Sequence, residues 1–151
     1  MINMAQLPLK QVVVGSNPIG PVIFISLFIL PFSMQNIDNW VNQILQDNNS
    51  LILVEGKRDV KALNKLGVLN VSSIDKPIYL LIEDIARKNK EVIILTDFDP
   101  QGRKLYHKIK HELNRNGVKV NDRYRKFLLR SKITHIEGLF TYYKNNSKET
   151  F

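Results

Sequence analysis

The chain of 151 residues contains no cysteine, which excludes disulfide bonds, zinc sites built on thiolates and thiol nucleophiles. A cysteine-free chain suits a reducing compartment, and we expect a cytoplasmic protein. Glycine and proline are also few, at 7 and 6 residues, and no internal repeat is present. The hydrophobic content of 44% is enough for a core, and the length suits one domain.

Charge is almost absent from the first 33 residues, where Lys10 is the one charged side chain. The apolar stretch at 21–32 is shorter than the roughly 20 residues that cross a bilayer, and no clear cleavage site for a signal peptide follows it. An added strand, a membrane-associating tail and sequence upstream of the true start are the three interpretations. Because a helical pattern begins soon after Met34, we favour an extension outside the fold and expect a chain beginning at Met34 to fold and work. The expected organisation is an extension at 1–33, one domain at 34–144 without membrane contact, and a polar tail at 145–151.

Acidic residues are scarce between 103 and 132, where eleven basic side chains face two acidic ones, a balance of +9. The whole chain carries a formal net charge of +8 and has a pI near 9.7. Clustered lysine and arginine bind the phosphate backbone of nucleic acids, so we expect RNA or DNA as a partner. A solvated helix surface on a basic protein is the alternative interpretation.

Apolar residues recur at helical spacing and in short runs that alternate along the chain, which predicts a doubly wound α/β fold with a parallel sheet. The continuous β-branched and leucine content of 92–96 is typical of a strand buried on both sides. Predicted strands cover 51–54, 68–72, 92–96, 118–120 and 133–136; predicted helices cover 37–45, 59–66, 77–88, the stretch after 102, the stretch after 122, and 139–143.

Three carboxylates follow two of the predicted strands directly. Glu55 comes after the run at 51–54, and Asp97 and Asp99 come after the run at 92–96. Ligands of parallel α/β sheets lie beyond the carboxyl ends of the strands, so these acids converge if the two strands are neighbours. Oxygen ligands of this kind suit Mg²⁺, which also binds phosphate, and Mn²⁺ is a substitute. The pattern points to phosphoryl chemistry.

Each acid also has a purely structural interpretation. Asp99 could cap the following helix, and Glu55 could be a surface residue of an ordinary turn before Gly56. Asp59 is at least as well explained as a helix cap as it is as a metal ligand. The cations that flank the acids would bind phosphates or simply be solvated; they are Lys57, Arg58, Arg103, Lys104 and Lys108.

The three histidines give weaker signals. His107 and His111 are four residues apart and share a helix face, but lysines lie between them and no acidic third ligand is evident. A surface role or a phosphate contact therefore explains them better than a metal site. His135 lies in an apolar run, so we expect a structural histidine there.

Two motifs together resemble the Toprim domain: VEGKRD at 54–59 and LTDFDPQGR at 95–103. This is the catalytic module of topoisomerases, bacterial primases, OLD-family nucleases and the ribosomal-RNA maturation nuclease. The resemblance covers about 51–139, and the short chain is most similar to the small stand-alone Toprim proteins. It implies a compact Rossmann-like sheet of about four parallel strands between helices.

The resemblance also implies roles by position. Glu55 matches the general acid/base of the family, Asp97 and Asp99 match its Mg²⁺-binding aspartates, and Asp59 matches an acid that supports a second metal in some members. The absence of cysteine excludes a primase-type zinc module, and no breakage-reunion domain is evident. DNA relaxation and primer synthesis are therefore not expected of this chain alone.

The leading hypothesis is Mg²⁺-dependent phosphodiester hydrolysis or nucleotidyl transfer on nucleic acid, as in RNA processing or DNA repair. One alternative is a non-catalytic Mg²⁺-binding subunit that docks RNA or DNA within a larger complex, with a protein partner or a second copy of the chain. Another is a phosphatase in which Asp97 is the nucleophile and Asp99 the acid. That pattern normally has Thr or Val where Gln101 stands and needs no upstream Glu-Gly, so it ranks last.

Overall fold

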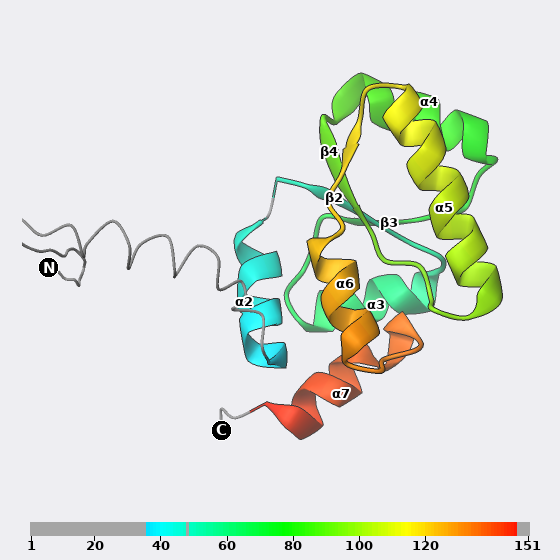
Figure 1. Cartoon of the computed structure of the whole chain (residues 1–151). Helices are drawn as coiled ribbons and strands as arrows, with labels where there is room; N and C mark the ends of the chain where they lie inside the picture. Colours follow the sequence, from blue (N-terminus) through cyan, green and yellow to red (C-terminus); the bar gives the residue numbers. More distant parts are fainter. Residues whose placement is uncertain (1–35, 48, 148–151) are drawn as a thin grey trace, which may run out of the picture. The chain divides into compact units, whose positions relative to one another are not determined.

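The computed structural model describes residues 36–47 and 49–147, and Figure 1 shows how their helices and strands are arranged. All of these elements belong to one compact unit, Ile37–Phe151. The expectations for 1–33 concern residues outside the described part of the chain. Among the described residues, no helix combines the length and the apolar character that crossing a membrane requires.

Four parallel strands form the sheet, in the order β3-β2-β4-β5. They are β2 (Leu51–Val54), β3 (Val71–Ser73), β4 (Glu91–Ile94) and β5 (Lys119–Val120). Apart from their first residues, β2 and β4 are fully buried, as their apolar composition predicted. The expected α/β fold with about four parallel strands is confirmed.

A helix lies between each strand of the sheet and the next along the chain, and helices cover the sheet (Figure 1). In a parallel sheet each strand must be reached by a crossover connection, and a helix is the usual one. The described part of the chain contains α2 (Ile37–Gln46), α3 (Lys57–Lys65), α4 (Ile78–Lys88), α5 (Pro100–Arg115), α6 (Arg123–Arg130), the 3₁₀ helix η2 (Ile136–Gly138) and α7 (Leu139–Asn146).

Side chains from the two central strands enter the core of the unit. Leu53 of β2 and Ile94 of β4 pack in one cluster with Ile82 of α4 and Ile109 of α5. Because side chains alternate along a strand, their neighbours in sequence face the other side, where α6 contacts β4. The core thus holds both central strands from two sides and fixes their relative position.

The helices α2 and α6 are joined by an aromatic pair and a hydrogen bond. Trp40 is fully buried, and its ring meets that of Tyr124 edge to face with centroids 6.0 Å apart. Its indole Nε1 donates to the backbone carbonyl of Tyr124 at 3.0 Å, so the polar atom of this large side chain is satisfied in the core. This contact fixes α6 against α2, and α6 carries part of the basic segment, residues 103–132.

Several predicted elements differ from those in the structure. The strand predicted at 68–72 is Val71–Ser73, and the strand predicted at 92–96 is Glu91–Ile94. The helix expected from 59 begins at Lys57, with Gly56 as its N-cap, and the helix expected after 102 begins at Pro100. The segment 133–136, predicted as a strand, makes one backbone bond to the loop after β4, from the N–H of Phe98 to the carbonyl of Thr134 at 3.0 Å, and ends in η2. An apolar run of four residues fits a strand and a buried irregular segment equally well.

Candidate metal and nucleic-acid site

β2 and β4 are neighbours in parallel register, with Leu53 opposite Ile94, so their carboxyl ends meet at one edge of the sheet. Glu55 follows β2 there, and Asp97 follows β4. The Oε2 atom of Glu55 accepts a hydrogen bond from the backbone N–H of Asp97 at 3.0 Å. The structure therefore brings together two acids that are 42 positions apart in the sequence.

The carboxylate of Asp97 is held by a third segment of the chain. Its Oδ1 accepts the backbone N–H of Ile136 at 3.0 Å, at the start of η2. The side chain is half-buried, and one oxygen is thus committed to the protein. This hydrogen bond fixes the orientation of the carboxylate, and no described residue donates a hydrogen bond to its other oxygen.

Asp99 is the N-cap of α5, as the structural interpretation of the sequence allowed. Its Oδ1 accepts the backbone N–H of Gly102 at 2.6 Å, and Pro100 takes the first helical position. An N-cap side chain has a fixed direction, because it must reach the free N–H groups of the first turn. Capping uses one carboxylate oxygen of Asp99 and leaves the second for another ligand.

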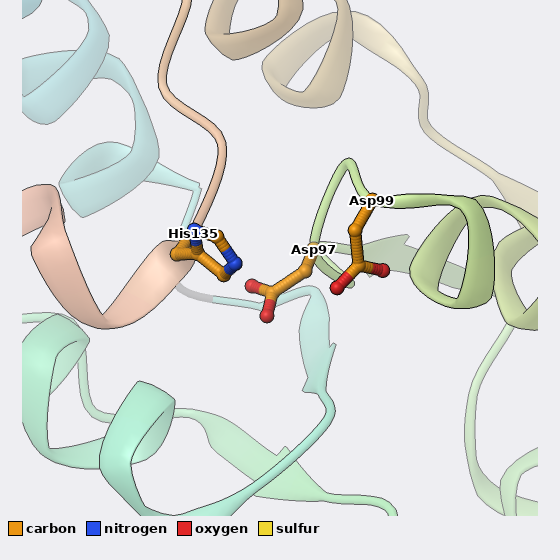
Figure 2. A group of neighbouring side chains, drawn as sticks. All are labelled: Asp97, Asp99 and His135. Carbon is orange, nitrogen blue, oxygen red and sulfur yellow. The ribbon is translucent and has the colours of Figure 1, made fainter.

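His135 lies beside these two aspartates, although its sequence context predicted a structural histidine. One donor atom from each of Asp97, Asp99 and His135 lies within 4.8 Å of the others. Figure 2 shows how these three side chains lie next to one another. The ring is exposed, whereas its neighbour Ile136 is buried. The prediction was wrong because it assumed a strand, and the irregular segment turns the imidazole outward instead.

Asp59 takes part in capping α3, as its structural interpretation allowed, but Gly56 and not Asp59 is the N-cap. Asp59 lies at the third residue of α3, is 5% exposed, and its Oδ2 accepts the N–H of Gly56 at 3.0 Å. The bond fixes the turn that follows Glu55. The group of donor atoms around Asp97 does not include Glu55 or Asp59. A cation bound by that group would therefore lie beside these two acids and not between them.

Burial and the neighbouring acids raise the pKa of Glu55 and of Asp59. Burial raises the pKa of Glu55 most, the charges of Asp97 and Asp99 raise it further, and the N–H of Asp97 opposes the shift. Burial likewise raises the pKa of Asp59, and the charge of Asp97 adds to it. Like charges gathered in a half-buried place are unfavourable without a cation. The donor set and its electrostatics thus fit a divalent metal ion.

Arg125 supports the strand end from inside the protein, and no local pattern in the sequence indicated this. Its guanidinium is buried and donates to the carbonyl of Thr96 at 2.6 Å and to that of Asp97 at 3.5 Å. It also lies over the rings of Phe98 and Tyr106, at 4.4 and 4.2 Å from their centroids. Arg125 is therefore a buried structural residue, although it belongs to the basic stretch 103–132 that led us to expect nucleic acid as a partner.

Gly102 allows the first turn of α5 to approach the acids. A Cβ atom at this position would lie 2.1 Å from the backbone oxygen of Asp97 and 2.7 Å from Oε2 of Glu55. The carbonyl of Gly102 also accepts the hydroxyl of Thr96 at 2.8 Å. A side chain here would collide with the backbone of Asp97 and with the carboxylate of Glu55 that bonds to it.

Comparisons with known proteins agree with this geometry. A model of the Toprim domain matches residues 50–128. The chain belongs to the Toprim family. The Toprim match begins next to β2 and ends within α6, and so includes Glu55, Asp97 and Asp99. Membership supports a metal-dependent role connected with nucleic acid, because Toprim domains generally bind divalent metal.

The chain is also similar to individual proteins. The UPF0292 protein MJ1624 of Methanocaldococcus jannaschii is 47% identical over 97 residues, which are 60% of this chain and 76% of the relative. The UPF0292 protein PH1700 of Pyrococcus horikoshii is 36% identical over 106 residues, covering 66% and 78% of the two chains. A solved structure, a putative protein from Aquifex aeolicus, has a TM-score of 0.65 and 33% identity, and the match covers 68% of this chain and 97% of that one.

The predicted phosphate-binding cations of this Toprim domain are all exposed. Arg58 lies 3.9 Å from Glu137, and Arg103 donates to the carbonyl of Phe98 at 2.6 Å. The remaining three have no recorded ion pair with any described residue; they are Lys57, Lys104 and Lys108. By contrast, several other cations of the basic segment form ion pairs with carboxylates, namely Lys110, Arg115 and Lys119.

Proposed function

We propose that the protein catalyses metal-dependent phosphodiester hydrolysis or nucleotidyl transfer on nucleic acid, with Mg²⁺ or Mn²⁺ as its cation. The observation that carries the proposal is the hydrogen bond between Glu55 and the N–H of Asp97, which joins two acidic strand ends at one edge of the sheet. Ligand sites of parallel α/β sheets lie at this edge. The cytoplasm is the compartment that such an activity implies.

Asp97 and Asp99 would hold the metal ion with the carboxylate oxygens that their structural hydrogen bonds leave open. The bound cation would stabilise the negative charge that develops on the scissile phosphate. The protein fixes both carboxylates before any ligand arrives, Asp97 through the N–H of Ile136 and Asp99 through the N–H of Gly102. Such preorganisation avoids a cost of rearrangement during the reaction.

Glu55 would move the proton between water or a hydroxyl group and the reacting phosphate. Burial and three neighbouring acids raise its pKa, which brings the carboxylate closer to the range in which a general base works well. Oε2 is occupied by the N–H of Asp97, so Oε1 is the atom available to the substrate. The nearby cations Arg58 and Arg103 would then meet the phosphate oxygens.

The test is a cleavage assay with Mg²⁺ and with Mn²⁺ on single-stranded, duplex and structured substrates. We expect Glu55→Gln to lower the cleavage rate by at least about 100-fold, because it removes the proton acceptor but keeps the oxygen that accepts from Asp97. Glu83→Gln, an exposed glutamate of α4 paired with Arg87, is the matched control and should leave the rate unchanged.

Cleavage that survives in Glu55→Gln would mean either that the base is assigned wrongly or that a contaminating nuclease is present. Salt-sensitive binding of nucleic acid without any turnover by the wild-type protein would contradict the catalytic proposal. That second outcome would favour a docking subunit that acts with a protein partner.

The exposed lysines of α5 should contribute to the affinity for nucleic acid. Lys104 and Lys108 are four residues apart and lie on one face of the helix, away from its buried side. We expect Lys104→Ala/Lys108→Ala to weaken binding about tenfold at moderate salt and to lower the slope of log K against log salt by about 1.5 to 2, as for two lost phosphate contacts. Fluorescence anisotropy at several salt concentrations measures both.

Lys119→Ala is the control for this pair, because Lys119 is exposed but lies at the amino end of the strands and faces Glu91 at 3.3 Å. Its loss should change neither the affinity nor the salt slope. If Lys119→Ala weakened binding as much as the double variant, the contribution would be one of overall charge and not of a surface near the acids.

A further inference from the structure

We propose that His135 is the third protein ligand of the metal site, and that this imidazole makes the site prefer Mn²⁺ to Mg²⁺. The inference rests on the proposed function, since it assumes that Asp97 and Asp99 hold a cation. Magnesium strongly prefers oxygen ligands, whereas first-row transition metals bind imidazole nitrogen well. A set of two carboxylates and one imidazole therefore favours the transition metal.

The residues before and after His135 are both hydrogen-bonded to the loop 97–99, which carries the two aspartates. The carbonyl of Thr134 accepts the N–H of Phe98 at 3.0 Å, and the N–H of Ile136 donates to Oδ1 of Asp97 at 3.0 Å. Phe98 lies between the two aspartates in sequence. The residue between two such hydrogen bonds has little freedom, so its side chain is presented to the same place as the carboxylates.

The orientation of the ring is also set. Thr134 Oγ1 lies 3.0 Å from Nδ1 of His135, which leaves Nε2 as the nitrogen available for a ligand. Figure 2 shows a ring nitrogen turned towards the carboxylate of Asp97. Histidine ligands of metals commonly form a hydrogen bond through the other ring nitrogen, which fixes the tautomer. Thr134 is placed to provide it.

The separation of the three donor atoms is of the right size. All lie within 4.8 Å of one another, and atoms that share a cation at about 2.1 Å are about 3 to 4 Å apart. Small adjustments of the three side chains on binding close the difference. An exposed imidazole with an acidic pair beside it is also poorly explained by packing, which was its expected role.

The decisive experiment measures Mn²⁺ and Mg²⁺ binding to the full chain by isothermal titration calorimetry, together with pulsed EPR of bound Mn²⁺. For His135→Gln we expect the Kd for Mn²⁺ to rise about tenfold or more, the Kd for Mg²⁺ to change less than about twofold, and the nitrogen hyperfine coupling to disappear. His107→Gln, an exposed histidine of α5, is the matched control and should change none of these values.

The possible results separate this inference from the proposed function. If Asp97→Asn abolishes binding of both metals while His135→Gln alters neither, the carboxylate site stands and the inference about His135 is wrong. The same conclusion follows if wild-type protein with bound Mn²⁺ lacks nitrogen coupling. If the wild-type chain binds neither metal, both the inference and the proposed function are wrong. Circular dichroism of each variant shows that the fold is retained.

Discussion

Replacement of Asp97 and Asp99 together by asparagine is expected to abolish metal-dependent cleavage, with a fall of about 10⁴-fold or more, because the cation stabilises the charge of the transition state by several kcal/mol. Asparagine keeps the shape of both side chains and keeps an oxygen that can accept from Ile136 at one position and from Gly102 at the other. It is also as good an N-cap as aspartate. The variant therefore loses the two negative charges that would bind the cation and little else.

Thermal unfolding distinguishes this loss of charge from a loss of structure. A ligand that binds the folded state stabilises it, so Mg²⁺ or Mn²⁺ should raise the Tm of the wild-type protein and leave that of Asp97→Asn/Asp99→Asn unchanged. Without metal, the variant should be at least as stable as the wild type, because the repulsion of Glu55 by both aspartates is removed.

A matched control replaces two aspartates elsewhere by asparagine. Asp75 is exposed and Asp84 pairs with Lys76 and Arg87 on the surface, so Asp75→Asn/Asp84→Asn removes the same charge from the protein as a whole. This control should keep both the cleavage and the metal-dependent rise in Tm. Full activity and an unchanged metal response in Asp97→Asn/Asp99→Asn would instead show that the cation, if any, binds at another place.

The features of this site that the sequence predicted are local ones. β2 is an apolar run that ends directly before Glu55, and the apolar run of β4 continues to Leu95, two residues before Asp97, so the runs alone place both acids just beyond strand ends. The cap formed by Asp99 could also be expected, because the residue stands immediately before Pro100 at the start of a helix. Only the adjacency of β2 and β4 had to be assumed, and the parallel pairing confirms it.

The features that the sequence did not predict depend on contacts between distant segments. Arg125 lies among other basic residues on α6, and nothing in that pattern distinguishes a solvated arginine from one that is buried under the strand end. His135 was misjudged because the short apolar run around it was taken for a strand. In both cases the position of the side chain follows from packing against the loop after β4, which periodicity cannot describe.

At Gly102 the helix propensity of the residue opposes its packing against Asp97. The variant Gly102→Ala measures which of the two effects on stability is larger. Gly102 lies in the first turn of α5, where alanine is normally favoured over glycine by roughly 0.5–1 kcal/mol. The added Cβ would lie 2.1 Å from the backbone oxygen of Asp97, which, unlike the end of a flexible side chain, cannot move aside without a shift of the main chain. Overpacking of this kind costs about 1–3 kcal/mol, occasionally more, so we expect the contact to outweigh the propensity.

Urea unfolding of the metal-free protein should therefore show Gly102→Ala to be less stable by about 2 kcal/mol. Because the same Cβ lies 2.7 Å from Oε2 of Glu55, the bond between Glu55 and Asp97 should break, and cleavage should fall by at least about 100-fold even where the variant is fully folded. Gly138→Ala is the control: its φ is −85°, and a Cβ there meets no atom within 4 Å, so its stability should be unchanged or slightly higher. A Gly102→Ala protein as stable and active as this control would mean that α5 can withdraw from the strand ends, and that the close approach of helix and acids is not required for the site.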